Sequence, residues 1–264
     1  MLEINNIYKT FNPGTVNEKV ALNGVSLKLN DGDFVTVIGG NGAGKSTLLN
    51  AVAGTWKVDE GSILIDGIDV TKMQDYKRAK FLGRVFQDPM MGTVPTMGID
   101  ENLALAARRG KFRGLAREIT AKERAGFKEI VKILDLGLED RLTSKVGLLS
   151  GGQRQAVTLL MASLKKPKLL LLDEHTAALD PKTAAKVLDA TETIVDRDHL
   201  TTLMITHNMK DAIAHGNRLI MMKDGKIILD ISGKEKKNLT VEELLEKFNS
   251  AGGEDAVNDR MILG

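Results

Sequence analysis

The sequence has no cysteine, and only one of its 264 residues is tryptophan. Without cysteine the chain can form neither disulfide bonds nor thiolate metal sites, which excludes a disulfide-stapled secreted domain. No charge of one sign dominates, because 37 lysines and arginines face 35 aspartates and glutamates, a formal net charge of +2. This balance gives no electrostatic basis for a dedicated nucleic-acid binder. The length suits one large domain or two small ones with a real hydrophobic core.

Long apolar runs are also missing. A membrane-spanning helix needs about 20 mainly apolar residues, whereas the run Leu169–Leu172 is closed by Lys168 and Asp173. The first ten residues contain Glu3 and several polar side chains, so they do not form a secretory signal. We therefore expect an intracellular chain, either soluble or held at a membrane only by its partners.

Apolar patterns predict alternating strands and helices along the chain. Strands are predicted at residues 2–7, 20–29, 34–38, 62–65, 84–86, 169–172, 201–205, 218–222 and 226–230. Helices are predicted at residues 45–54, 99–109, 121–136, 151–164 and 241–248. Because helical patterns dominate between Asp88 and Pro167, we expect an α/β core that carries a helical subdomain.

The glycine-rich segment Gly39–Ser46 matches the pattern G-x-x-x-x-G-K-[ST], follows a predicted strand and opens a predicted helix. Glycines allow backbone N–H groups to surround phosphate oxygens, and the helix N-terminus adds positive potential. Lys45 is expected to reach the β- and γ-phosphates, Ser46 to bind Mg²⁺ and Thr47 to contact the α-phosphate. The alternative, a chance glycine-rich turn, is disfavoured by this context. The nucleotide-binding residues predicted here are Gly39, Asn41, Gly42, Gly44, Lys45, Ser46 and Thr47.

Two acids, Asp173 and Glu174, directly follow the apolar strand predicted at residues 169–172. Ligands of open α/β sheets bind beyond the carboxyl ends of the strands. Asp173 is expected to hold Mg²⁺ through water, and Glu174 to act as the general base on the attacking water. The alternative is two solvated acids at a strand end. It is disfavoured because the same chain carries the predicted phosphate loop Gly39–Ser46.

The string Leu149–Gln153 reads LSGGQ and lies between the phosphate loop and the two carboxylates. In this order the motifs resemble those of the ATP-binding cassette (ABC) ATPases, over nearly the whole chain. Gln87 resembles the family's Q-loop glutamine, Asp180 its D-loop aspartate and His207 its switch histidine. Phosphate-loop kinases lack the LSGGQ string, so that alternative is disfavoured.

The resemblance implies a head-to-tail dimer in which Ser150, Gly152 and Gln153 of one copy bind the ATP held by the phosphate loop of the other. Ser150 also precedes a predicted helix, which is independent support for a second anion-binding helix N-terminus. Gln87 would contact Mg²⁺ and the γ-phosphate, and His207 would bind the γ-phosphate.

Three aromatic or histidine positions have less specific interpretations. Phe11 stands where the family stacks an aromatic ring on adenine, with core packing of Phe11 or the neighbouring Tyr8 as the alternative. His175 stands where relatives usually have proline, and we assign it no catalytic role.

The fold implied by the resemblance is a P-loop NTPase (RecA-like) α/β core, with an N-terminal antiparallel β subdomain and an inserted α-helical subdomain. One ABC ATPase domain would span residues 1–248, with its core at 1–88 and 166–248, its helical subdomain at 89–165 and a tail at 249–264. The implied cofactors are ATP and Mg²⁺. The implied location is the cytoplasmic face of the cell membrane, where the chain would be a peripheral protein.

The implied function is the ATP-hydrolysing subunit of an ABC transporter, most simply an importer of amino-acid type, with aromatic amino acids as the weakest part of the interpretation. The partners would be a second copy, integral membrane permease subunits and a solute-binding protein, with no nucleic acid. The alternative is a soluble ABC ATPase that acts on nucleic acid or ribosomes. The methionine-containing loop 90–97 and the basic cluster Arg108–Arg113 are candidate contact surfaces, although loop packing and a solvated helix end explain them as well.

Overall fold

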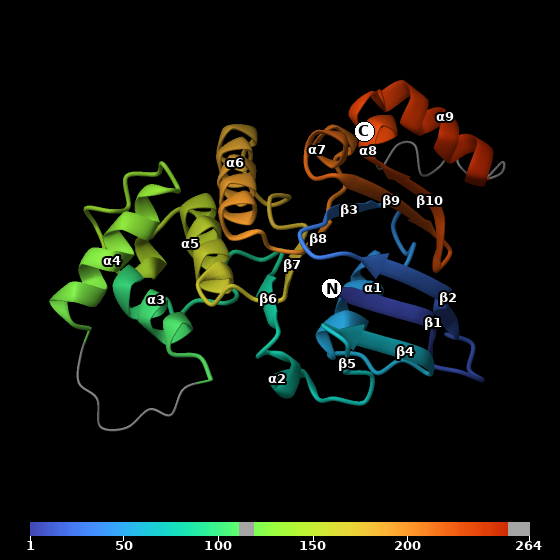
Figure 1. Cartoon of the computed structure of the whole chain (residues 1–264), viewed down its shortest axis with the longest axis horizontal. Coiled ribbons are helices and arrows are strands. Elements are labelled where there is room, and N and C mark those ends of the chain that lie inside the picture. The colour runs from blue at the N-terminus through green and yellow to red at the C-terminus, as the bar shows by residue number, and fades with distance from the viewer. Residues whose placement is uncertain (111–118, 253–264) are drawn as a thin grey trace.

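The computed structural model describes residues 1–110 and 119–252. It contains one six-stranded sheet, one four-stranded sheet and helices that lie in two main groups, α3 to α6 at one end and α7 to α9 beside β9 and β10 (Figure 1). The fold class expected from the sequence is confirmed by this mixed α/β architecture. None of the described helices is long and apolar enough to cross a membrane.

The six-stranded sheet forms the core and positions the site. Its order is β10-β9-β3-β8-β7-β6, and only the β9–β10 pair is antiparallel. The strands are β3 (Phe34–Ile38), β6 (Leu82–Val85), β7 (Leu169–Asp173), β8 (Thr202–Ile205), β9 (Arg218–Lys223) and β10 (Lys226–Ser232). Every residue of β3 is buried. This is typical of a mainly apolar strand that is covered on both faces of its sheet. The carboxyl ends of the central parallel strands therefore meet at one edge.

The second sheet is antiparallel, in the order β2-β1-β4-β5. It consists of β1 (Leu2–Phe11), β2 (Lys19–Leu29), β4 (Glu60–Ile65) and the short β5 (Ile68–Asp69). Its apolar face packs on helix α1 (Lys45–Ala53) and on one face of the larger sheet in a shared hydrophobic core. This packing holds Phe11, at the end of β1, beside the start of α1.

The helices between β6 and β7 form a lobe at one end of the molecule, with α6 beside it (Figure 1). They are α3 (Ile99–Ala107), α4 (Ala121–Lys132), a 3₁₀ turn (Val146–Leu148) and α5 (Gly151–Ser163). Helix α6 (Pro181–Asp198) packs on α5 and shares its hydrophobic core. The basic cluster predicted at Arg108–Arg113 is described only as far as Gly110; Lys111, Phe112 and Arg113 lie outside the described residues.

The remaining helices are α2 (Asp75–Arg78), α7 (Met209–Ala214), α8 (Gly233–Lys237) and α9 (Val241–Gly252). Helices α7 and α9 pack with β9 and β10 in a third hydrophobic cluster. Helix α9 runs to Gly252, past the predicted end at Phe248. The rest of the predicted tail lies outside the described residues.

Some predicted boundaries were wrong. The helix predicted to reach Leu136 ends at Lys132, because Asp135 adopts a positive φ of 48° and leaves the helical region. The helix predicted to reach Arg109 ends at Ala107, three residues before the chain turns at Gly110, where φ is 75°. Helix α6 was not predicted, although Asp180 caps it and Pro181 opens it, an arrangement typical of helix starts.

Candidate nucleotide site

The phosphate loop connects the buried end of β3 with the N-terminus of α1. Gly39 and Gly44 both have positive φ, 149° and 101°. A Cβ at Gly39 would overlap the carbonyl oxygen of Met222, and one at Gly44 would overlap that of Ala21. Only glycine fits at these two positions, so the loop can curl tightly and present its backbone N–H groups.

Lys45 lies inside the curve of this loop. Its side chain is buried, and Nζ donates hydrogen bonds to the carbonyl oxygens of Gly39 at 2.6 Å and Gly40 at 3.0 Å. A buried ammonium group at the N-terminus of a helix gives the loop a positive charge at the place where phosphates would bind.

A cavity of about 330 Å³ opens beside the loop and brings most of the predicted site residues together. It is lined by Phe11, Lys19, Ala21, Asn41, Gly42, Ala43, Gly44, Lys45, Ser46, Thr47, Glu174 and His207. Lys19, which the sequence did not single out, adds a second cation at the first residue of β2. Gly39 lies beneath the loop and is buried.

Phe11 forms one wall of this cavity. Its ring meets the Trp56 ring edge to face, with centroids 5.3 Å apart and planes at 82°. Phe11 is half-exposed and does not belong to the buried core. The interpretation of Phe11 as a core-packing residue is therefore not supported. The Phe11 ring, supported from the side by Trp56, offers an apolar surface beside the phosphate loop.

Glu174 and His207 face each other at the other side of the cavity. Glu174 Oε1 lies 2.5 Å from His207 Nε2, and the Glu174 residue is 9% exposed. Glu174 has a positive φ of 47°, unusual for a non-glycine residue, and its N–H donates to the Ile205 carbonyl. A carboxylate fixed in this way can orient and deprotonate a water molecule in the cavity.

Asp173 ends β7, and its side chain is largely shielded from water. Burial raises the pKa of its carboxyl group, while the guanidinium of Arg84 opposes that rise. Arg84 Nη2 lies 3.3 Å from Asp173 Oδ2. Sequence reasoning missed Arg84, since the two residues are 89 positions apart and no local pattern joins them.

The predicted metal ligands have the hard oxygen donors that Mg²⁺ prefers, a hydroxyl on Ser46 and a carboxylate on Asp173. Within the described residues no group of three or more His, Cys, Asp or Glu side chains could hold a metal. A site with so few protein ligands fits an ion that keeps waters and takes phosphate oxygens of its substrate. Gln87 is exposed just beyond β6 and does not line the cavity described above.

The LSGGQ segment begins α5 in the way expected for a second anion site. Ser150 is the N-cap, since its hydroxyl accepts a hydrogen bond from the Gln153 N–H at 3.3 Å, and Gln153 Oε1 accepts one from the Ser150 N–H. A Cβ at Gly152 would overlap the Thr183 methyl group of α6. Asp180 caps α6 by accepting from the Thr183 N–H at 3.0 Å. Although these residues are all described, none of them lines the phosphate-loop cavity of the same chain.

Two other predicted features lie elsewhere. His175 is fully buried, its Nε2 lies 3.1 Å from Thr191 Oγ1, and burial lowers the pKa of its imidazole to about 4. Met90 and Met91 are exposed, and the loop carrying them is tied to α5, because Arg154 donates to the Met90 carbonyl and to Thr93 Oγ1.

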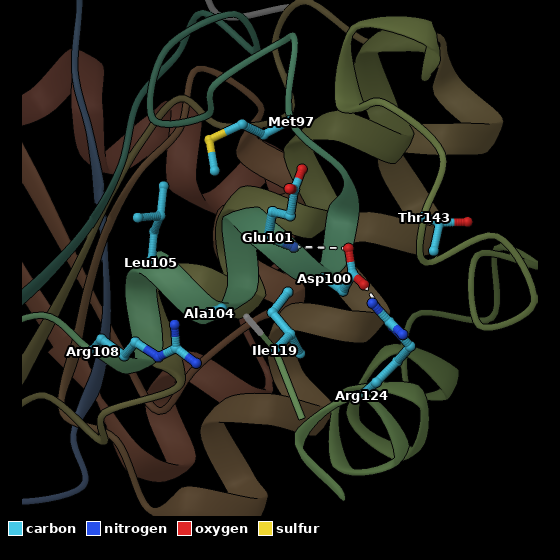
Figure 2. A pocket seen from close by; sticks show the side chains of 9 residues that line it. All are labelled: Met97, Asp100, Glu101, Ala104, Leu105, Arg108, Ile119, Arg124 and Thr143. Carbon is cyan, nitrogen blue, oxygen red and sulfur yellow. Dashed lines mark hydrogen bonds and ion pairs between the residues drawn. The ribbon is translucent and has the colours of Figure 1, made fainter. Parts of the chain in front are cut away.

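A second cavity, of about 480 Å³, lies between α3 and α4 (Figure 2). Asp100 and Arg124 form an ion pair of 2.7 Å at its side, and Met97 points into the same region. Its lining includes none of the predicted nucleotide-site residues.

Comparison with known proteins gives one consistent family. The family model described as "ABC transporter" matches residues 22–177. The chain is 47% identical over 256 residues to the tyrosine transport ATP-binding protein of Clostridioides difficile, covering 95% of this chain and all of that protein. It is 32% identical to the spermidine/putrescine import ATP-binding protein PotA of Haemophilus ducreyi, over 94% of this chain and 64% of that protein.

Solved structures agree. One is a dimeric ATP-binding cassette in a post-hydrolysis state with ADP and Pi bound, with a TM-score of 0.74 and 31% identity over 88% of this chain and 98% of that one. Another is an ADP-bound cassette of an ABC transporter, with a TM-score of 0.75 and 29% identity over 94% of this chain and 98% of that one. The chain therefore belongs to the ABC transporter family of ATP-binding cassettes, whose members hydrolyse ATP to power transport.

Proposed function

We propose that this chain works as a head-to-tail dimer that sandwiches two ATP molecules and powers an importer. One observation carries the proposal. The chain has two helix N-termini suited to phosphate, at Lys45 and at Ser150, yet the cavity beside the first contains no residue of the second. A second copy supplies the missing surface if its Ser150 and Gly152 approach the phosphates from the open side.

Each residue then has a distinct task. Lys45 and the backbone of the phosphate loop neutralise phosphate charge, and the Phe11 ring supports the adenine. Glu174 accepts a proton from the attacking water, while His207 holds the carboxylate and bonds the γ-phosphate. Asp173, Ser46 and Gln87 would hold Mg²⁺, which when bound neutralises charge that develops on the phosphates.

The transport part of the proposal rests on relatives. Their names describe ATP-binding proteins of tyrosine transport and of spermidine/putrescine import. We infer that this chain docks on integral membrane permease subunits at the cytoplasmic face, that a solute-binding protein delivers the solute, and that the solute is an aromatic amino acid. The soluble alternative, an ATPase acting on nucleic acid or ribosomes, gains no support from these relatives.

The dimer is tested with a variant that binds but cannot hydrolyse ATP. Glu174→Gln removes the base, and we expect it to elute as a dimer with Mg-ATP and as a monomer without. Adding Ser150→Arg places a bulky cation in the LSGGQ segment, and we expect this double variant to remain a monomer. The matched control is Glu174→Gln with Ser250→Arg on α9, which should still dimerise. A Ser150→Arg double variant that dimerises fully with ATP refutes the sandwich.

Transport is tested in the native source. The chain should copurify with an integral membrane protein, and its loss should abolish uptake of labelled tyrosine or phenylalanine. Isolation without any membrane partner contradicts the transport role. Copurification with unchanged aromatic uptake contradicts only the choice of solute.

A further inference from the structure

Arg84 reaches from the edge strand β6 of the larger sheet to the carboxylate that ends the neighbouring strand β7. It lies on β6, paired with Leu171 of β7, and its Nη2 is 3.3 Å from Asp173 Oδ2. Both side chains are largely shielded from water, with 18% of the Arg84 side chain and 15% of the Asp173 side chain exposed. The pair is therefore screened less than a surface ion pair.

Arg84 is also fixed from the side of α1. The same Nη2 donates to Asn50 Oδ1 at 2.9 Å, and Nη1 donates to Thr55 Oγ1 at 3.3 Å. The guanidinium stacks 4.5 Å from the centroid of the Phe86 ring, directly before Gln87. These contacts place the cation without help from Asp173, so the charge stays near the carboxylate whether or not Asp173 binds something else.

The contact links the two halves of the proposed metal site. Asn50 Nδ2 donates to the carbonyl oxygen of Ser46 at 2.8 Å, and Ser46 is the proposed hydroxyl ligand. Arg84 thus connects the helix that carries one ligand with the strand that carries the other. A positive charge held here repels a second cation and occupies one oxygen of its carboxylate.

We propose that Arg84 is a resident cation of the magnesium site, which shares Asp173 with the ion and so sets the Mg²⁺ concentration that nucleotide binding requires. The inference rests on the proposed assignment of Asp173 as a magnesium ligand. Arg84 acts through Asp173 and does not touch the nucleotide, so it is a positioning residue.

The test is an equilibrium titration of nucleotide binding with Mg²⁺, followed by a fluorescent ATP analogue under conditions without turnover. Arg84→Met keeps the length and apolar stem of the side chain but removes its charge. We expect it to lower the midpoint Mg²⁺ concentration by about fivefold, because a partly shielded repulsion is lost. Arg84→Lys retains the charge and should stay close to the wild-type midpoint.

The matched control is Arg124→Met, which breaks an ion pair of the same type with Asp100 in the second cavity (Figure 2). Its midpoint should equal that of the wild type. An Arg84→Met midpoint that is unchanged or raised overturns the inference, and so does an Arg84→Lys midpoint as low as that of Arg84→Met. Asp173→Asn distinguishes a failure of the Arg84 inference from a failure of the proposed magnesium ligand. If this variant keeps the wild-type Mg²⁺ dependence, the assignment of Asp173 as a ligand is wrong. Thermal melting of each variant verifies that it is folded.

Discussion

At the scale of single residues, the contact between Glu174 and His207 is central to the proposed hydrolysis. The carboxylate lies 2.5 Å from the imidazole Nε2 at the edge of the phosphate-loop cavity. Glu174 is buried and has an unusual backbone conformation. The orientation of its carboxylate therefore depends on the few groups that contact it. His207 is one of them, so under the proposed function it supports the general base as well as contacting the γ-phosphate.

Replacing His207 by alanine should therefore slow hydrolysis with little effect on nucleotide affinity. We expect kcat to fall by about 10²-fold, the lower range for losing one positioned acid–base group. His215→Gln is the control, since His215 pairs with Glu192 at 2.9 Å and does not line the cavity. Steady-state ATPase kinetics decide the matter, and equal kcat values for the two variants would mean that His207 plays no special part.

At the scale of elements, the LSGGQ segment has a packing role in addition to the phosphate contact proposed for it. Helix α5 begins at Gly151 and meets α6, which begins at Pro181, so closely that the Thr183 methyl group occupies the space of a Gly152 side chain. Close approach of two helices requires a small residue at the contact. Gly152 therefore has a structural reason to be glycine that does not depend on a second copy of the chain.

Gly152→Ala should destabilise the fold of the isolated monomer. Overpacking of this kind costs about 1–3 kcal/mol in the free energy of unfolding. Adding Thr183→Ser removes the clashing methyl group while it keeps the hydroxyl, and should recover most of the loss. Urea denaturation of the single and double variants measures the coupling between the two positions. Additive effects would show that the two helices do not compete for this space.

At the scale of the whole molecule, the core sheet explains which parts of the site could be predicted. The phosphate loop follows β3, Glu174 follows β7 and His207 follows β8. These strands are parallel neighbours, so local patterns were enough to place the three features at one edge. The LSGGQ string was identified by its resemblance to the cassette motif and by its place between the phosphate loop and the two carboxylates, whereas a serine N-cap with glycines alone indicates only the start of a helix.

What could not be predicted depends on contacts between distant segments. The Arg84–Asp173 pair joins two strands, and the Phe11–Trp56 pair joins β1 to the chain beyond α1. Neither has a periodic or spacing signal, since each arises only after the sheets assemble. Lys19, the first residue of β2, also lines the cavity only because the strands assemble around it. Helix α6 does carry a local signal, since Asp180 precedes Pro181, but the resemblance assigns Asp180 only to the D-loop.

His175, which lies just beyond β7, makes the stability of the whole fold depend on pH. It follows Glu174, is buried between that strand and α6, and meets Thr191 of α6 at 3.1 Å. Burial lowers the pKa of its imidazole from 6.5 to about 4. The folded chain therefore resists protonation here, whereas the unfolded chain binds a proton below about pH 6.5. Stability from this residue is complete above pH 6.5 and is lost as the pH falls toward 4.

His175→Gln should flatten that part of the stability curve, because glutamine does not titrate in this range. Over the interval from pH 6.5 to 4 the wild type should lose up to about 3 kcal/mol more than the variant in its free energy of unfolding, as a shift of this size implies. Urea denaturation at half-unit pH steps measures both curves, and the comparison uses their slopes, so a constant packing cost of glutamine does not affect it. His199→Gln, at the end of α6, is the control and should keep the wild-type slope. If His175→Gln and the wild type lose stability in parallel, the imidazole at position 175 accepts its proton in the folded chain as readily as in the unfolded one.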